Sequence, residues 1–236
     1  MLLAYMKQLL IALFSIALVL AVVWLFTRYF DDDEVVIVTA HYKENLEWLK
    51  RSNMKVVVCD KPGADPMPFP PDPKCSLDQN RGREASVFLK YIIENYDNLP
   101  KYVAFIHGHE EAWHQSGDLL ESIRRAKKEG RPYISLNNRI DLRCDDAPKD
   151  VDIDPTHSVE DRHAAFILVM KKWDEIFGPI LNIPRPRYFR FQCCAQFIVS
   201  RDAILRHSKD EYKTLYDFVM DPTEYDYDTS RAVEFI

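Results

Sequence analysis

Residues 102–114 read Tyr102-Val-Ala-Phe-Ile-His107-Gly-His109-Glu-Glu-Ala-Trp113-His114, an apolar run followed within eight positions by three histidines, two acids and a tryptophan. The apolar run is typical of a buried β-strand. In open α/β sheets, ligands bind just beyond the carboxyl ends of the strands. We therefore expect the functional site to begin at His107.

Strand and helix patterns alternate on both sides of this segment. Apolar, β-branched runs predict further strands at residues 35–39, 55–59 and 133–136 and within 191–200. Helical spacing of apolar residues predicts helices at 44–51, 84–96, 117–129, 163–177 and 201–220, with Gly130 as a carboxyl cap. Repeated β-α units with short connections predict an α/β fold, with a mostly parallel sheet flanked by helices.

The amino-terminal segment has a different character. Residues 9–26 are apolar except for Ser15, a run long enough to cross most of a bilayer core. We interpret it as a retained transmembrane anchor rather than a cleaved signal peptide, because large side chains follow it. The predicted organisation is a short tail (1–8), an anchor (9–29), an acidic juxtamembrane linker (30–34) and a single domain (35–236). We expect the short amino terminus to be cytosolic, which would place the domain in a lumen or outside the cell.

The net charge and the cysteine spacing argue against some classes of function. The formal net charge of −6 offers no broad basic field, which argues against nucleic acid as a partner. Five cysteines show no CxxC pair and no zinc-ligand spacing. They form either disulfides, if the domain faces an oxidising lumen, or buried free thiols.

Several motifs in one order carry a family resemblance. They are residues 35–49, Asn80-Arg81-Gly-Arg83-Glu84, residues 96–100, residues 105–109 with Trp113-His114, and residues 194–200. Together they resemble the family called domain of unknown function 3431 from about residue 35 to the chain end. That family commonly closes on a segment ending in Trp-His; residues 230–236 reproduce only its beginning.

The first strand and the turn after it are also similar to the start of nucleotide-sugar-dependent glycosyltransferases of the GT-A fold, the nucleotide-diphospho-sugar transferase fold. This similarity implies that the turn with His41 and Glu44 holds the nucleotide of a nucleotide-sugar donor. It also implies a glycan acceptor and a divalent metal at a strand end. Such an analogy concerns the fold and raises only a prior for function.

His107 and His109 are the candidate metal ligands. Imidazoles at i and i+2 of an extended segment can face one ion, and imidazole suits manganese or zinc better than magnesium. The alternative is a hydrogen-bonded pair that closes the strand–helix loop. The candidate catalytic residues are Glu111, His114 and Gln196. Gln196 would face the acceptor; the alternative, which we favour for this segment, is packing in the sheet.

Arg81, Arg83 and Glu84 precede a predicted helix. Amide groups at a helix amino terminus, assisted by an arginine, form an anion site suited to a diphosphate. The alternative is a capped helix start without a ligand. The rival acidic pair, Asp152 and Asp154, follows no buried strand and fits a solvated surface loop.

The sequence therefore predicts a membrane-anchored glycosyltransferase-like protein that transfers a sugar from a nucleotide-sugar donor with a divalent metal. The alternatives are a non-catalytic domain that binds glycan or metal at a membrane surface, and a hydrolase with a histidine-bound metal.

Overall fold

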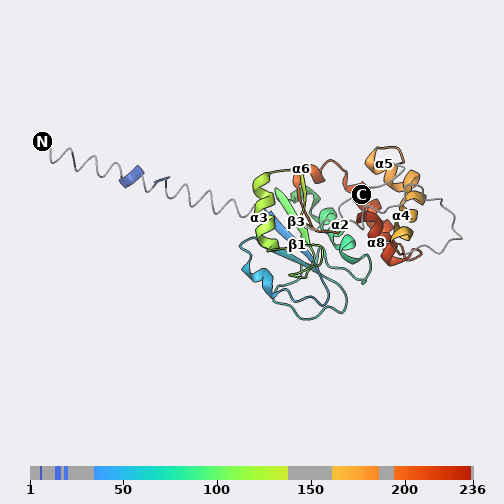
Figure 1. The fold of residues 1–236 in the computed structure, drawn as a ribbon, viewed down its shortest axis with the longest axis horizontal. Coiled ribbons are helices and arrows are strands. Elements are labelled where there is room, and N and C mark those ends of the chain that lie inside the picture. The colour runs from blue at the N-terminus through green and yellow to red at the C-terminus, as the bar shows by residue number, and fades with distance from the viewer. Residues whose placement is uncertain are drawn as a thin grey trace. The chain divides into compact units, whose positions relative to one another are not determined.

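The structure, a computed structural model, describes residues 35–137, 161–185 and 194–234, together with residues 6, 14–16 and 19–20 (Figure 1). The chain divides into two compact units, Met1–Glu34 and Val35–Ile236. Most of the predicted anchor at 9–29 lies outside the described residues, as do Asp152 and Asp154. Within the part of the chain that is described, no helix has both the length and the apolar character needed to span a bilayer.

The second unit is built on a five-stranded sheet in the order β2-β1-β3-β5-β4. The strands are β1 (Val35–His41), β2 (Lys55–Asp60), β3 (Tyr102–Ile106), β4 (Tyr133–Ser135) and β5 (Phe197–Ser200). β1 pairs in parallel with β2 and β3, whereas β5 is antiparallel to both β3 and β4.

The sheet is thus mixed, and the prediction of a mostly parallel sheet was wrong. The α/β class itself is confirmed. The error arose at β5, whose apolar run indicates a strand but carries no information about its direction. Strand direction depends on which end of the sheet the chain enters, and periodicity does not encode this.

Alternate residues of the central strands face two separate cores. On one face, Val35 and Ile37 of β1 and Ala104 and Ile106 of β3 pack against the 3-10 helix η1 (Glu47–Arg51) and helix α3 (Leu119–Glu129). On the other face, Val36, Val38, Val103 and Phe105 pack against helix α2 (Arg83–Asn95). The helices therefore cover both faces of the sheet, as alternating β-α units require.

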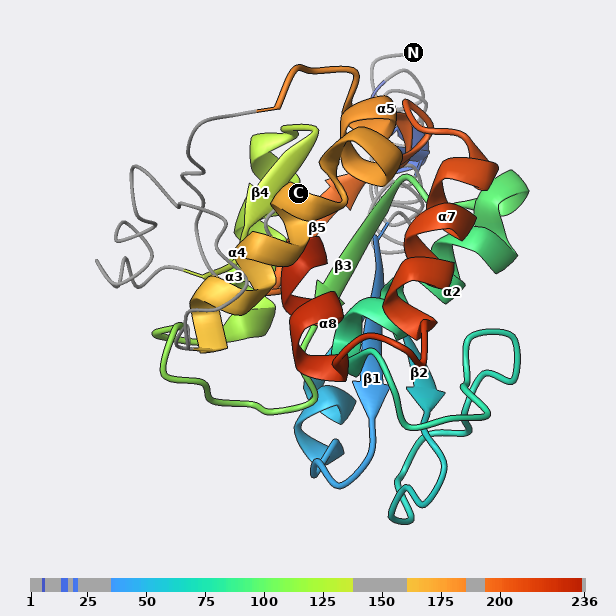
Figure 2. The same ribbon diagram turned by 90° about the vertical axis from the view of Figure 1, so that its right-hand side faces the viewer.

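A third cluster of apolar side chains extends the α2 face. It joins α2 to the carboxyl-terminal helices α7 (Lys209–Met220) and α8 (Asp226–Glu234), which lie along it (Figure 2). It also includes α4 (Asp161–Lys171), the π-helix η4 (Trp173–Phe177) and α5 (Gly178–Leu181). The short elements η2 (Tyr96–Asn98) and α6 (Arg201–Ile204) complete the described helices.

Local signals explain several helix ends. Asp118 caps α3 by accepting from the amides of Leu120 and Glu121, and Gly130, at φ 66°, ends it as predicted. The predicted helix 201–220 is instead two helices, because Ser208 and Glu211 form a capping box that starts α7 afresh. Of the cysteine alternatives, the structure has a disulfide between Cys59 at the end of β2 and Cys75.

Candidate functional site

The carboxyl ends of β2, β1 and β3 meet at one edge of the sheet. The chain leaves β1 toward β2 on one side, and β3 then pairs with the other side of β1. The β1–β2 connection covers one face, and α2, which connects β2 to β3, covers the other. This reversal is the topological switch point at which open α/β sheets bind their ligands.

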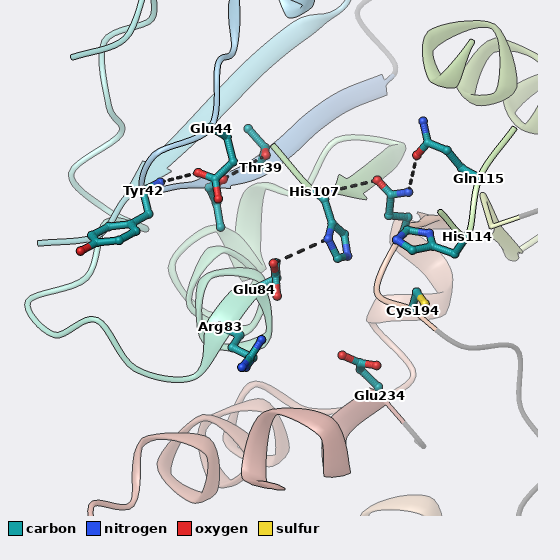
Figure 3. Close-up of polar contacts among 12 residues, drawn as sticks. Thr39, Tyr42, Glu44, Arg83, Glu84, His107, His114, Gln115, Cys194 and Glu234 are labelled. Atoms are coloured by element: carbon teal, nitrogen blue, oxygen red, sulfur yellow. Dashed lines mark hydrogen bonds and ion pairs between the residues drawn. The ribbon is translucent and has the colours of Figure 1, made fainter. Parts of the chain in front are cut away.

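His107 follows β3 at this edge and faces the first turn of α2 (Figure 3). Its ring Nδ1 lies 3.6 Å from Glu84 Oε1, and its backbone amide donates to Gln196 Oε1 at 3.1 Å. Burial lowers the pKa of His107, while the negative charge of Glu84 opposes that shift. Its Nε2 is buried and has no hydrogen-bond partner among the described residues. An imidazole whose Nε2 is buried and unpaired among the described residues is thus held at the strand end.

Glu44 lies in the turn after β1 and contacts the loop after β3. Its carboxylate accepts from the amides of Tyr42 at 2.7 Å and Lys43 at 3.0 Å. Burial raises the pKa of Glu44, but these hydrogen bonds outweigh burial and leave it below its ordinary value. Gly108 is required beside it, because a Cβ at residue 108 would lie 2.8 Å from Glu44 Cβ. The turn after β1 and the loop after β3 therefore pack closely against each other at Glu44 and Gly108.

His41, at the end of β1, is fully enclosed. Its Nδ1 lies 2.9 Å from Asp60 Oδ1, while its Nε2 is buried without a hydrogen-bond partner in the described part of the chain. It faces the η1 side with Thr39 rather than the α2 side, since side chains alternate along a strand. The structure thus separates His41 from His107, although both sit at the same sheet edge.

Lys61 is a site residue that the sequence prediction missed. It follows β2, is only 8% exposed, and alternates onto the α2 face with Cys59. Burial lowers its pKa, and the charges of Glu84, Asp226 and Glu44 oppose that shift. The sequence signal that could have indicated Lys61 was its position just after an apolar strand. We call Glu44, Lys61, Glu84 and His107 the strand-end site.

The segment before α2 has an unusual backbone. Gly82 is left-handed at φ 77°, and a Cβ there would lie 2.5 Å from atoms of Ser86 and Val219. Arg83 also has a positive φ, of 45°, which costs a non-glycine residue about 1–3 kcal/mol and is typical of functional sites. Its guanidinium lies 4.8 Å from the centre of the Tyr227 ring.

Arg81 has a different role from Arg83. Its guanidinium donates to the backbone carbonyls of Asp221 and Glu224, the latter at 2.6 Å. The Gly82 amide donates to Asp226 Oδ1 at 2.5 Å. Arg81 therefore ties the start of α2 to the α7–α8 connection, and only Arg83 of the two predicted anion-binding arginines is exposed.

A buried group of side chains, mostly amides, lies next to the backbone of His107, whose amide donates to one of them, Gln196. Gln196 Nε2 donates to Gln115 Oε1 at 2.7 Å, and Asn137 Oδ1 lies 2.8 Å from His114 Nδ1. Asn137 Nδ2 also donates to the carbonyls of Cys194 at 2.7 Å and Gln196 at 3.2 Å. We call Gln115, Asn137, Gln196 and His114 the amide cluster. Gln115 and Asn137 were not predicted; their only sequence signals were that Gln115 directly follows His114 and that Asn137 directly follows the predicted strand 133–136.

The rest of the histidine-rich loop points outward. His109 and Glu111 are exposed, and Glu110 forms an ion pair with Arg51. Trp113 is 58% exposed and meets the His114 ring edge-on, at 5.3 Å between centroids. The described residues contain no group of three or more histidine, cysteine or acidic side chains placed to hold a metal ion. The metal predicted at His107 and His109 stays a prediction.

Comparison with known protein families identifies one that matches this chain. A family model described as "Protein of unknown function (DUF3431)" matches residues 36–236. No curated protein and no solved structure matches the chain.

Proposed function

Since this chain belongs to the DUF3431 family of proteins of unknown function, we propose a function from its strand-end site: transfer of a sugar from a nucleotide-sugar donor to a hydroxyl acceptor. The observation that carries this proposal is His107, with Nδ1 toward Glu84 and a buried, unpartnered Nε2. A proton on Nδ1 facing the carboxylate leaves Nε2 as a base.

The reaction would use His107 as its base. The acceptor hydroxyl oxygen would attack the anomeric carbon while the bond from that carbon to the diphosphate oxygen breaks. The hydroxyl proton would pass to His107 Nε2, and the diphosphate would leave with the bonding electron pair. No step is routed through a metal, and the predicted metal at His107 and His109 stays a prediction.

The leaving diphosphate would be stabilised by the start of α2 and by two cations. Helix amides at an amino terminus favour anions. Lys61 and Arg83 flank that terminus, one buried and one exposed. A bound diphosphate would also favour the charged form of Lys61, because its negative charge opposes the lowering of the Lys61 pKa by burial.

The cellular setting is part of the proposal. We propose that residues 9–29 anchor the chain in a membrane and that the domain is lumenal or extracellular. The Cys59–Cys75 disulfide supports this, because disulfides persist in oxidising compartments. Labelling of free thiols in protein taken directly from cells tests it, and quantitative labelling of both cysteines would argue for a reducing compartment.

The binding step is tested by thermal unfolding of the full chain with a panel of nucleotide sugars, with and without manganese. A ligand that binds only the folded state raises the melting temperature. The variant Lys61→Met should weaken binding of the responding nucleotide sugar by about tenfold or more, since a charge-assisted contact contributes about 1.5–3 kcal/mol. The control Lys50→Met changes an exposed lysine paired with Glu47 and should leave binding unchanged.

The outcomes separate the candidate functions. Binding that is lost in Lys61→Met but kept in Lys50→Met supports the strand-end site. Binding of nucleotide sugar without transfer to any acceptor would favour a non-catalytic binding domain. If no nucleotide sugar shifts the melting temperature, the proposed transfer is wrong.

A further inference from the structure

An apolar pocket of about 460 Å³ lies on the α2 face of the sheet. Its described lining comes from α2, from β3, β5 and β4, and from α5, α6, α7 and α8. Ligand pockets of this kind are mostly apolar and have volumes of about 300–1,000 Å³. The pocket is therefore large enough to hold a small molecule.

One end of the pocket adjoins the strand-end site. Ala85, which lines it, follows Glu84, and Phe105 lies two residues before His107 on the same side of β3. Cys194 and Glu234 also line the pocket, and Figure 3 shows both together with Glu84, His107 and His114. A molecule in the pocket could thus present its polar end to His107.

The pocket extends from this end along α2. Its α2 lining runs from Ala85 to Ile92, a distance of roughly 10 Å at 1.5 Å per residue. The far end is marked by His207, whose carbonyl accepts from Tyr96 Oη just beyond α2. The long axis therefore leads away from the strand-end site.

Several polar groups of the lining are already engaged within the chain. Tyr212 Oη donates to the carbonyl of Ile204 at 2.9 Å, and Glu211 caps α7. Glu234 lies 3.1 Å from Arg231. The walls consequently offer a ligand apolar contact along its length, and His107 lies two residues beyond Phe105, a lining residue at the near end.

We propose that this pocket binds the aliphatic chain of the acceptor, an alcohol whose hydroxyl reaches His107. This inference rests on the proposed function. The volume is roughly three times that of a 150 Å³ cavity that takes benzene, and with the 10 Å length it admits a chain on the order of ten carbons. The acceptor is thus an amphipathic alcohol rather than a free sugar.

A series of linear alcohols from four to sixteen carbons, titrated against the full chain, tests the chain-length limit. Each methylene that enters the pocket should tighten binding about fourfold, with a plateau near ten carbons. No gain with length, or a gain that continues through sixteen carbons as in unspecific partition, would overturn the proposal.

Two matched variants locate the binding. Ala203 is half-buried in the lining of the pocket. The larger side chain in Ala203→Phe should fill part of the pocket and reduce affinity for the ten-carbon alcohol at least tenfold. Ala164→Phe changes a half-buried alanine of α4 outside the lining and should bind as the wild type does. Equal affinity in both variants would overturn the proposal. If Ala203→Phe does not fold, a ten-carbon alcohol with a photoreactive far end should label Ile204 or Tyr212 in the wild type, and labelling confined to other segments would contradict it.

The nucleotide-sugar titration distinguishes the two failures. Alcohols that bind in the pocket while no nucleotide sugar binds would refute the transfer and the acceptor role together. Nucleotide sugars that bind while alcohols do not would refute the acceptor alone.

Discussion

The strand-end site and the amide cluster are neighbours at the end of β3 but differ in how their buried polar atoms are satisfied. In the amide cluster, the side chains of Gln196, Asn137 and His114 form hydrogen bonds with one another and with neighbouring groups, at 2.7–3.5 Å. In the strand-end site, His107 Nε2 has no partner within the described chain, and Lys61 is buried among acids. Because buried polar groups are normally paired, we infer that the first region stabilises the fold and propose that the second binds a ligand.

The largest expected effect is on stability and falls on the amide cluster. Gln196→Leu keeps the volume but removes the partners of the His107 amide and of Gln115. Two buried groups left unpaired cost about 1–3 kcal/mol each, so we expect a loss of about 4 kcal/mol in the free energy of unfolding. For a domain of this size, that lowers the melting temperature by about 8–16 °C. Gln79→Leu, on the surface, is the control, and a loss below about 1 kcal/mol in Gln196→Leu would refute the role of the cluster.

The next effect concerns the disulfide that fixes the loop after β2. Cys59 and Cys75 are 16 positions apart in the sequence, and Lys61 lies in the loop that their disulfide closes. Cys59→Ala with Cys75→Ala should lower the free energy of unfolding by about 3 kcal/mol, because the unfolded chain regains the entropy of an open loop. Urea unfolding of wild type and variant measures this. A melting temperature that is indifferent to both the variant and a reductant would contradict it.

A smaller effect separates the two arginines before α2. Arg81→Ala should cost about 2 kcal/mol, since its guanidinium bonds to two carbonyls of the α7–α8 connection. Arg83→Ala should change stability by no more than about 0.5 kcal/mol but weaken nucleotide-sugar binding. Urea unfolding and binding titration of both variants check this. Equal stability losses would mean that Arg83 is also structural.

The last of these effects is a pH dependence. Burial lowers the pKa of His107 and of His114, so the unfolded chain binds more protons than the folded one just below pH 6.5. Stability should therefore be complete above the unfolded pKa near 6.5 and fall as the pH is lowered toward the folded values. Urea unfolding between pH 8 and 5 should show a flatter profile in His107→Gln with His114→Gln. Parallel profiles for wild type and variant would refute the assignment to these histidines.

The sequence predicted the edge of the sheet that holds the site, because apolar runs ending in polar residues mark strand ends. Glu44, Glu84 and His107, which come together there, were all predicted. Lys61 was missed because one lysine before a proline resembles any surface loop. The antiparallel β5 and the partners of Arg81 depend on chain direction and on contacts over more than 130 residues, which local patterns do not encode.

The role of His107 as the base can be tested by measuring two quantities in His107→Gln: affinity for the nucleotide sugar that stabilises the wild type, and the rate of sugar transfer to an alcohol. We expect the transfer rate to fall by about 100- to 10,000-fold, the usual contribution of a general base, with nearly unchanged affinity. Unfolding by urea should confirm a folded variant, since Nε2 makes no bond within the described chain. Transfer at the wild-type rate in His107→Gln would contradict the central claim.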